Sequence, residues 1–221
     1  MKIRMMLMMF CVLAITPAVF AQSNGSFETD TNPGGFTTVY MGNTNIDDWS
    51  VDFGSIDYIG SYWQASEGVR SIDMSGRNEA GQISQTLTTV AGWTYQVTFD
   101  MSGNPDGGCG VKEMSVSVDG LSSQSYTYDT CLSGNTREDM KWAPNTYYFT
   151  ATSSETVLTF TSLIAGFFGP ALDNVNIEIV TQICHRNSGK KGSKTLTVGA
   201  SAVAAHLAHG DSVGPCQAGD Q

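Results

Sequence analysis

Short segments in which apolar and polar residues alternate recur along the chain, and they limit its fold more than any other feature. In the segment 94–101, for example, Tyr95, Val97 and Phe99 alternate with polar neighbours, as in a strand with one buried face. The segments predicted as strands are 49–53, 55–59, 69–74, 81–87, 94–101, 112–118, 124–128, 146–151, 156–161 and 172–180. Clusters of Gly, Asn, Asp and Ser separate them, and helical spacing is scarce before the tail. The pattern predicts an all-β fold, an antiparallel two-sheet β-sandwich of jelly-roll type.

The segment 172–180 places one acidic residue among apolar ones. Strict alternation puts Leu172 on one face, and Asp173, Val175 and the isoleucines that follow on the other. A buried carboxylate is costly unless it is paired, hydrogen-bonded or bound to a metal ion. We therefore expect a partner for Asp173: a metal ion, a turn that the carboxylate caps, or the guanidinium of Arg70 or Arg77.

The first 21 residues have the pattern of a secretory signal peptide. Lys2 and Arg4 precede an apolar run, and small residues suited to cleavage follow at 18–21. The run is short for a membrane span, and no second long apolar stretch exists, so we expect no span in the mature chain. We expect the protein to be secreted, and to act outside the cell or at the cell surface.

The charge composition limits the classes of molecule that the protein can bind. The chain has 11 basic and 21 acidic residues, for a formal net charge of −10. An acidic surface repels phosphate backbones, so the sequence argues against nucleic acid as a partner of the main domain. Most of the basic residues of the tail lie in a flexible-looking stretch after Val180, where Lys190, Lys191 and Lys194 form a cluster.

Four cysteines remain after removal of the signal peptide, which contains Cys11: Cys109, Cys131, Cys184 and Cys216. An even number in an exported protein favours disulfides, and three pairings are possible. Closeness in sequence favours Cys109–Cys131 and Cys184–Cys216. Together with the change of composition after Val180, the cysteines predict a β-sandwich domain over 22–180 and a small disulfide-closed module over 181–221.

Several sequence blocks resemble, in order, those of a secreted family. The chain has Asn24-Gly-Ser-Phe-Glu28 near its mature start and Gly169-Pro-Ala-Leu-Asp-Asn-Val175 near the end of the sandwich. The other matching blocks are 49–59, 63–76, 81–87, 95–105 and 140–142. The order is similar to that of the family called domain of unknown function 642, or choice-of-anchor C, over about residues 24–180. The resemblance implies a galactose-binding-like sandwich that binds glycans outside the cell, and it supplies no catalytic residue.

A second resemblance bears on Asp173. Jelly-roll carbohydrate-binding modules often begin with a block similar to 24–28 and end with one similar to 172–175, and carboxylates from both ends hold a structural Ca²⁺. The resemblance implies that Glu28 and Asp173 are metal ligands, because Ca²⁺ prefers six to eight carboxylate and carbonyl oxygens. The tail resembles a short cysteine-bounded segment found at the ends of some exported bacterial proteins. The resemblance implies no activity for this segment.

Glycan binding requires aromatic faces and nearby polar groups, since sugar rings stack on the first and hydrogen-bond to the second. The candidate aromatic residues are Tyr58, Tyr62, Trp63, Trp142, Phe167 and Phe168. We single out Tyr62, Trp63, Trp142 and Phe167, together with Asn104 in a turn. The alternative for each aromatic residue is a place in the core, and for Asn104 a purely structural turn.

Catalysis by a histidine-based triad is excluded for the sandwich, because His185, His206 and His209 all lie in the tail. Paired carboxylates for glycoside cleavage stay an alternative, although no spacing singles out a pair. In the tail, Cys184-His185 and the i, i+3 pair His206 and His209 suggest a transition-metal site, but oxidation to a disulfide is the favoured state of the cysteines.

The sequence therefore predicts a secreted, non-catalytic carbohydrate-binding module that recognises an extracellular or cell-surface polysaccharide. Structural Ca²⁺ is the one cofactor expected. The alternatives are a structural or adhesion protein that binds no sugar and, less favoured, a carbohydrate-active enzyme. The identity of the glycan and the oligomeric state do not follow from the sequence.

Overall fold

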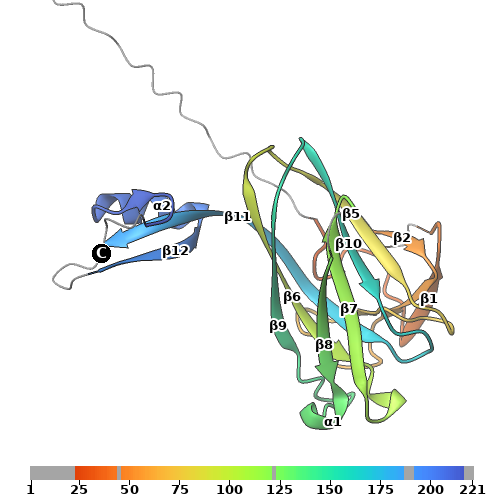
Figure 1. Cartoon of the computed structure of the whole chain (residues 1–221). Helices are drawn as coiled ribbons and strands as arrows, with labels where there is room; N and C mark the ends of the chain where they lie inside the picture. Colours follow the sequence, from red (N-terminus) through yellow and green to blue (C-terminus); the bar gives the residue numbers. More distant parts are fainter. Residues whose placement is uncertain (1–22, 44–45, 121–122, 187–191, 217–221) are drawn as a thin grey trace, which may run out of the picture.

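The computed structural model describes residues 23–43, 46–120, 123–186 and 192–216. The predicted signal peptide lies outside these ranges. The strands of the main domain form two antiparallel sheets that pack against each other (Figure 1), which confirms the predicted all-β sandwich. No helix of the described residues is long and apolar enough to cross a membrane.

Each sheet combines strands that are distant in the sequence. The first sheet has the order β1-β3-β4-β11-β6-β9 and the second the order β2-β5-β10-β7-β8. The first contains β1 (Phe36–Tyr40), β3 (Ser55–Ile59), β4 (Ser71–Asp73), β11 (Pro170–Arg186), β6 (Thr94–Gly103) and β9 (Ala143–Thr150). The second contains β2 (Ser50–Phe53), β5 (Gln82–Thr88), β10 (Glu155–Ser162), β7 (Val111–Val118) and β8 (Gln124–Asp129). A 3₁₀ turn, η1 (Pro105–Gly107), follows β6, and a short helix, α1 (Thr130–Ser133), follows β8.

The main core lies between the two sheets and is rich in aromatic side chains. The rings of Phe99 and Phe160, one from each sheet, meet edge to face with centroids 5.2 Å apart. Full burial of one such side chain stabilises the fold by about 1.5–3 kcal/mol. Tyr58 belongs to this core, and its hydroxyl donates a hydrogen bond of 2.6 Å to the carbonyl of Phe27. The side chain is therefore structural, and Tyr58 was wrong as a candidate for sugar stacking.

The strand β11 contains a β-bulge where the sequence predicted strict alternation. Asp173 pairs with Asp100, but Asn176 pairs with Thr98, so β11 carries one extra residue against β6. The bulge brings both Leu172 and Val175 into the main core. Asp173 is buried, as predicted, but it points away from this core because it neighbours Leu172 on the strand. The prediction that it shares a face with Val175 was wrong.

The C-terminal module is built on the far end of β11 (Figure 1). It contains β12 (Ser193–Gly199), α2 (Ala200–Ala208) and β13 (Ser212–Val213), and both strands pair with β11. Val180 is the last residue of β11 that pairs with β6 and the first that pairs with β12. The partner thus changes at the residue where the sequence placed the boundary, although β11 itself continues through it. The division into 22–180 and 181–221 stays an interpretation.

Both predicted disulfides are present. Cys109–Cys131 ties the segment after η1 to α1, and Cys184–Cys216 closes the C-terminal module. Each joins cysteines close in sequence, 22 and 32 residues apart, which is why proximity selected the right pairs. Disulfides of this kind are typical of proteins that fold in an oxidising compartment.

Candidate functional site

A groove of about 470 Å³ lies on the outer face of the first sheet, over β1, β3 and β4. On β3, Ile56 and Tyr58 point into the main core, so Asp57 and Ile59 point outward into the groove. We call this site the aromatic groove. It is lined by Phe36, Thr38, Tyr40, Asp57, Ile59, Tyr62, Trp63, Asp73, Gly76, Arg77, Asn104, Asp106, Phe167 and Phe168.

The floor of the aromatic groove is a row of polar side chains that crosses three strands. Thr38 on β1 pairs with Asp57 on β3, and Asp57 pairs in turn with Asp73 on β4. The Thr38 hydroxyl donates to Asp57 Oδ1 at 2.6 Å. Burial raises the pKa of Asp57 above its ordinary value, and the bond from Thr38 opposes this rise. Asp57 is only partly buried, so one polar group of the floor is accessible to a ligand.

Asp73, at the inner end of the row, has no exposed area, and backbone and side-chain donors surround it. Its Oδ1 accepts from the amides of Ser75 and Gly169, and its Oδ2 accepts from Asn104 Nδ2 at 2.7 Å. Burial nevertheless raises the pKa of Asp73 to about 7, although these bonds lower it. Asp73 therefore holds loops together beneath the groove and does not offer a free carboxylate to a ligand.

Two residues that line the groove, Tyr62 and Asp106, are linked to each other and to Arg137. The Tyr62 hydroxyl donates to Asp106 Oδ2 at 2.6 Å, and Arg137 forms an ion pair with the same oxygen at 2.7 Å. The guanidinium of Arg137 also lies over the Tyr62 ring, 4.1 Å from its centroid. Hydrogen bonds from Arg137 lower the pKa of Asp106, so this carboxylate is ionised at neutral pH. These contacts fix the orientation of the Tyr62 ring.

Aromatic rings line the same groove as the polar floor. Phe36 packs edge to face against Tyr62, with centroids 5.1 Å apart, and 47% of Phe36 is exposed. Phe167 and Phe168 belong to the loop before β11 and are 52% and 41% exposed. Large apolar side chains this exposed and this close together are unusual on a protein surface and mark binding sites.

The loop that carries Phe167 and Phe168 is held at its C-terminal end. Lys112 Nζ donates to the carbonyl of Phe168 at 2.7 Å, and the amide of Gly169 donates to Asp73 Oδ1. Burial lowers the pKa of Lys112, while its attraction to Asp73 raises it. Because the loop is held by buried groups, the two rings are presented in a defined place.

The structure brings four of the five predicted ligand-binding residues to this one groove: Tyr62, Trp63, Asn104 and Phe167. Two of the four, Trp63 and Asn104, are buried and so differ from the exposed binding residues that the sequence suggested. Trp63 is only 5% exposed, because it packs with Ile59 and Met140 in a second, smaller core and its Nε1 donates to Ser71 Oγ. It supports the groove from below and is not the loop platform that the sequence suggested. Asn104 is also buried, and its amide joins Asp73 to the turn η1.

Trp142, the fifth predicted residue, does not line the groove. It packs against the second core, and its Nε1 donates to the carbonyl of Gln64 at 3.0 Å. The core alternative that the sequence left open therefore describes its position.

The two predicted Ca²⁺ ligands lie on either side of one loop, and their described partners are hydrogen-bond donors. Asp173 Oδ2 accepts from the amides of Ser66 and Glu67, and Glu28 Oε1 accepts from those of Val69 and Arg70. The Arg70 guanidinium also approaches Glu28 Oε2 at 3.9 Å. Amide donors and a guanidinium do not fit a Ca²⁺ site, which needs oxygen ligands. Neither Arg70 nor Arg77 pairs with Asp173 among the described contacts, and structural Ca²⁺ stays a prediction.

Sequence reasoning missed Phe36, Asp57 and Asp106, which line the groove, and Arg137, which lies over the ring of Tyr62. The signal for Phe36 was present, because Phe36, Thr38 and Tyr40 alternate with their neighbours in the short strand β1. Asp57 and Arg137 carried no such signal. Their place depends on strand register and on a loop contact between residues far apart in the sequence.

A family model described as "Protein of unknown function (DUF642)" matches residues 21–178. Among curated proteins, Halomucin of Haloquadratum walsbyi (strain DSM 16790 / HBSQ001) is 35% identical over 161 residues. The match covers 70% of this chain but only 2% of Halomucin, so the chain spans a small part of that relative.

Solved structures of carbohydrate-binding modules are similar at lower identity. The CBM22-1 xylan-binding domain from Paenibacillus barcinonensis Xyn10C is 18% identical, with a TM-score of 0.43 over 67% of this chain and 97% of that domain. CBM35 from Cellvibrio japonicus Abf62 is 12% identical, with a TM-score of 0.42 over 64% of this chain and 91% of that module. Likeness at this level leaves the ligand of this chain to be inferred from its own side chains.

Proposed function

The chain belongs to the DUF642 family, and we propose that it is a secreted, non-catalytic protein that binds an extracellular or cell-surface polysaccharide in the aromatic groove. The observation that carries the proposal is the combination, in one groove, of aromatic side chains, three of them exposed, with a polar floor. Phe36 packs against Tyr62, and Phe167 packs against Phe168.

This arrangement suits a sugar chain for two reasons. The faces of sugar rings are apolar and pack on aromatic side chains, and the rims carry hydroxyl groups that need hydrogen-bond partners. In the groove, Asp57 accepts hydrogen bonds, while Arg77, whose guanidinium is exposed, donates them. A groove with both kinds of group favours a polysaccharide segment over a purely apolar ligand.

The burial and hydrogen bonds of the groove carboxylates support binding without catalysis. A glycosidase needs two carboxyl groups that reach the scissile bond, one as acid and one as base or nucleophile. Asp73 is buried with both oxygens hydrogen-bonded, and Asp106 is held by Tyr62 and Arg137. Asp57 is then the one groove carboxylate left with a single described donor, Thr38. One accessible carboxylate does not make the pair that glycoside cleavage requires.

A glycan-array screen of the mature protein, with and without added Ca²⁺, tests the proposal. We expect binding to a defined set of glycans, and Phe167→Ala should weaken that binding. Phe53→Ala is the matched control, because Phe53 is also exposed, at 60%, but lies on β2 in the other sheet. If no glycan binds under either condition, the proposal fails and a structural or adhesion role is favoured. If both variants weaken binding equally, the ligand does not lie in the aromatic groove.

A further inference from the structure

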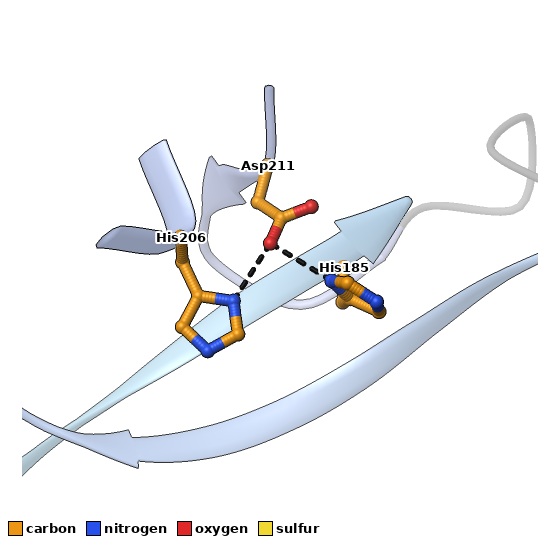
Figure 2. Close-up of side chains that lie close together, drawn as sticks. All are labelled: His185, His206 and Asp211. Atoms are coloured by element: carbon orange, nitrogen blue, oxygen red, sulfur yellow. Dashed lines mark hydrogen bonds and ion pairs between the residues drawn. The ribbon is translucent and has the colours of Figure 1, made fainter. Parts of the chain in front are cut away.

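Three side chains with metal-binding chemistry converge in the C-terminal module (Figure 2). None of them lines the aromatic groove. His185 lies near the end of β11, His206 in the last turn of α2, and Asp211 directly before β13. Asp211 Oδ2 lies 2.9 Å from His185 Nδ1 and 2.7 Å from His206 Nδ1. The two imidazole rings are nearly perpendicular, with centroids 5.7 Å apart.

Each of the three residues is positioned by a different structural constraint. Ser212 pairs with Cys184 in the β11–β13 ladder, which sets Asp211 beside His185. The amide of Asp211 donates to the carbonyl of His206, so the turn after α2 brings the helix end to the same place. The disulfide Cys184–Cys216 fixes the strand residue next to His185. The cluster is thus built by the fold and does not depend on flexible surface side chains.

The carboxylate at the centre of the cluster has no side-chain exposure. Its Oδ1 accepts from the amide of Arg186, and its Oδ2 faces the two imidazoles. Among the described residues no Lys or Arg forms an ion pair with Asp211. A buried carboxylate is normally balanced by a cation or by a metal ion. Lys194 lies opposite His185 across the β11–β12 ladder, but it is exposed, so solvent screens its charge.

We propose that His185, His206 and Asp211 bind a divalent transition-metal ion, with Zn²⁺ the ion that fits best. Two imidazole nitrogens and one carboxylate oxygen form a donor set typical of Zn²⁺ sites. Ligand atoms about 2.0–2.2 Å from one tetrahedral Zn²⁺ stand roughly 3.3–3.6 Å from one another. The three ligand atoms here lie within 4.8 Å of one another, so small side-chain movements bring them to that spacing when the ion replaces the two hydrogen bonds. The three residues leave at least one coordination position for water or another ligand. The His185 and His206 side chains are 33% and 22% exposed, so an ion can enter from solvent.

The site differs from the one that the sequence suggested for the tail. The sequence suggested Cys184 and His185 together with the i, i+3 pair His206 and His209. In the structure Cys184 is in the disulfide, and His209 is an exposed residue at the C-cap of α2, outside the cluster. His209 therefore provides a matched control, since it is a histidine at the same end of the same helix.

Titration of the full mature chain with Zn²⁺, after removal of metal with a chelator and with both disulfides intact, tests the proposal. Isothermal calorimetry should give one Zn²⁺ per chain. His185→Ala and His206→Ala should each weaken binding by more than 100-fold, beyond the ~10–100-fold that the loss of a residue behind a ligand costs. His209→Ala should bind as the unmodified chain does. Equal losses in all three variants, or no loss in His185→Ala and His206→Ala, would assign the binding to surface histidines and overturn the proposal.

A spectroscopic titration of the unmodified chain guards against variants that fail to fold. Co²⁺ bound by two imidazoles and a carboxylate in a four-coordinate site gives strong visible absorption bands, whereas Co²⁺ in water is nearly colourless. Saturation of these bands at one Co²⁺ per chain, and their loss when Zn²⁺ is added, are the expected results. A spectrum no stronger than that of aqueous Co²⁺ at protein excess would overturn the proposal without any variant.

Discussion

Asp173 and Glu28 lie at opposite ends of one loop, and each accepts two of its backbone N–H groups. The Asp173 carboxylate binds the amides of Ser66 and Glu67, and Glu28 binds the next pair of amides, those of Val69 and Arg70. The N-terminal segment is also joined directly to β11, because the amide of Val175 donates to the carbonyl of Gly25. The two ends of the sandwich are therefore linked through a loop from its middle.

Asp173→Ala should destabilise the fold by about 2–4 kcal/mol, because two partly buried amides, those of Ser66 and Glu67, lose their acceptor at about 1–2 kcal/mol each. Urea denaturation at pH 6 measures the change. Glu67→Ala is the control, since Glu67 lies in the same loop with an exposed side chain. A midpoint for Asp173→Ala that matches the control would show that the carboxylate does not hold the loop.

Added Ca²⁺ should leave the melting temperature of the metal-free protein unchanged. The carboxylates of Asp173 and Glu28 already accept hydrogen bonds from backbone amides, which a Ca²⁺ ion would have to replace. Differential scanning calorimetry with and without Ca²⁺ tests this expectation. A rise in melting temperature that Asp173→Ala abolishes would instead support the Ca²⁺ site predicted from the sequence.

Arg137→Ala should weaken glycan binding by about two- to fivefold, which corresponds to the ~0.5–1 kcal/mol of an exposed cation–π contact. The substitution removes the guanidinium from the Tyr62 ring and from Asp106, so the ring is less well oriented. Lys141→Ala is the matched control, because Lys141 also forms an exposed ion pair, with Asp139, and Asp139, unlike the Arg137 partner Asp106, does not line the groove. Equal affinities of the two variants for the glycan found in the screen would contradict the role of Arg137.

The stability of the sandwich should fall as the pH rises from 5 to 8. Burial raises the pKa of both Asp73 and Asp173 to about 7, well above the ~3.9 of an unfolded aspartate. The folded state therefore binds more protons than the unfolded state between these values, and this contribution is lost as the pH passes 7. One pKa unit corresponds to about 1.4 kcal/mol, so each carboxyl group should contribute a decline of about 2–3 kcal/mol between pH 5 and pH 7. Asp173→Asn, which cannot titrate, should show a smaller decline in urea denaturation at the two pH values, and a decline as large as that of the unmodified chain would exclude Asp173 as a cause.

Gly54→Ala should destabilise the protein by about 2–4 kcal/mol, because a methyl group there combines backbone strain with a steric clash. Gly54 has φ of +61°, and a Cβ atom would lie 2.1 Å from the carbonyl oxygen of Ala80. Gly134 has nearly the same φ, +59°, but open space around it, so Gly134→Ala should cost only about 1 kcal/mol. Thermal denaturation of the two variants separates the effect of the clash from that of the backbone strain. Equal losses of stability would show that the backbone around Ala80 moves away from the new methyl group without a loss of free energy.

Local sequence patterns predicted the strands well and the β11 bulge not at all. The strand predicted at 81–87 is observed as Gln82–Thr88, because period-two alternation reports directly which face is buried. At Asp173 the same rule failed, since the bulge is set by the pairing of β11 with β6 and not by the residues of β11 alone. Disulfide pairs were predictable because each partner is close in sequence.

The groove was predictable only where its residues carried a local signal. Tyr62 and Phe167 were found because they lie in loops with turn residues nearby, where an aromatic side chain is conspicuous. Asp57 and Arg137 were missed, because their neighbours come from β1, β4 and the loop at Asp106. Whether a loop tryptophan is exposed also depends on such distant contacts, as the burial of Trp63 shows.

The continuity of β11 through both parts of the chain has a mechanical consequence. A pull on the chain at Cys216 reaches β11 at Cys184 through the disulfide and then acts along the strand. Force in this direction loads the β6–β11 hydrogen bonds in shear, so many must break together, whereas a pull across the ladder would open them one at a time. A tether attached behind Cys216 would therefore resist tension well, and single-molecule pulling from that end should give a higher unfolding force than pulling across the sheet.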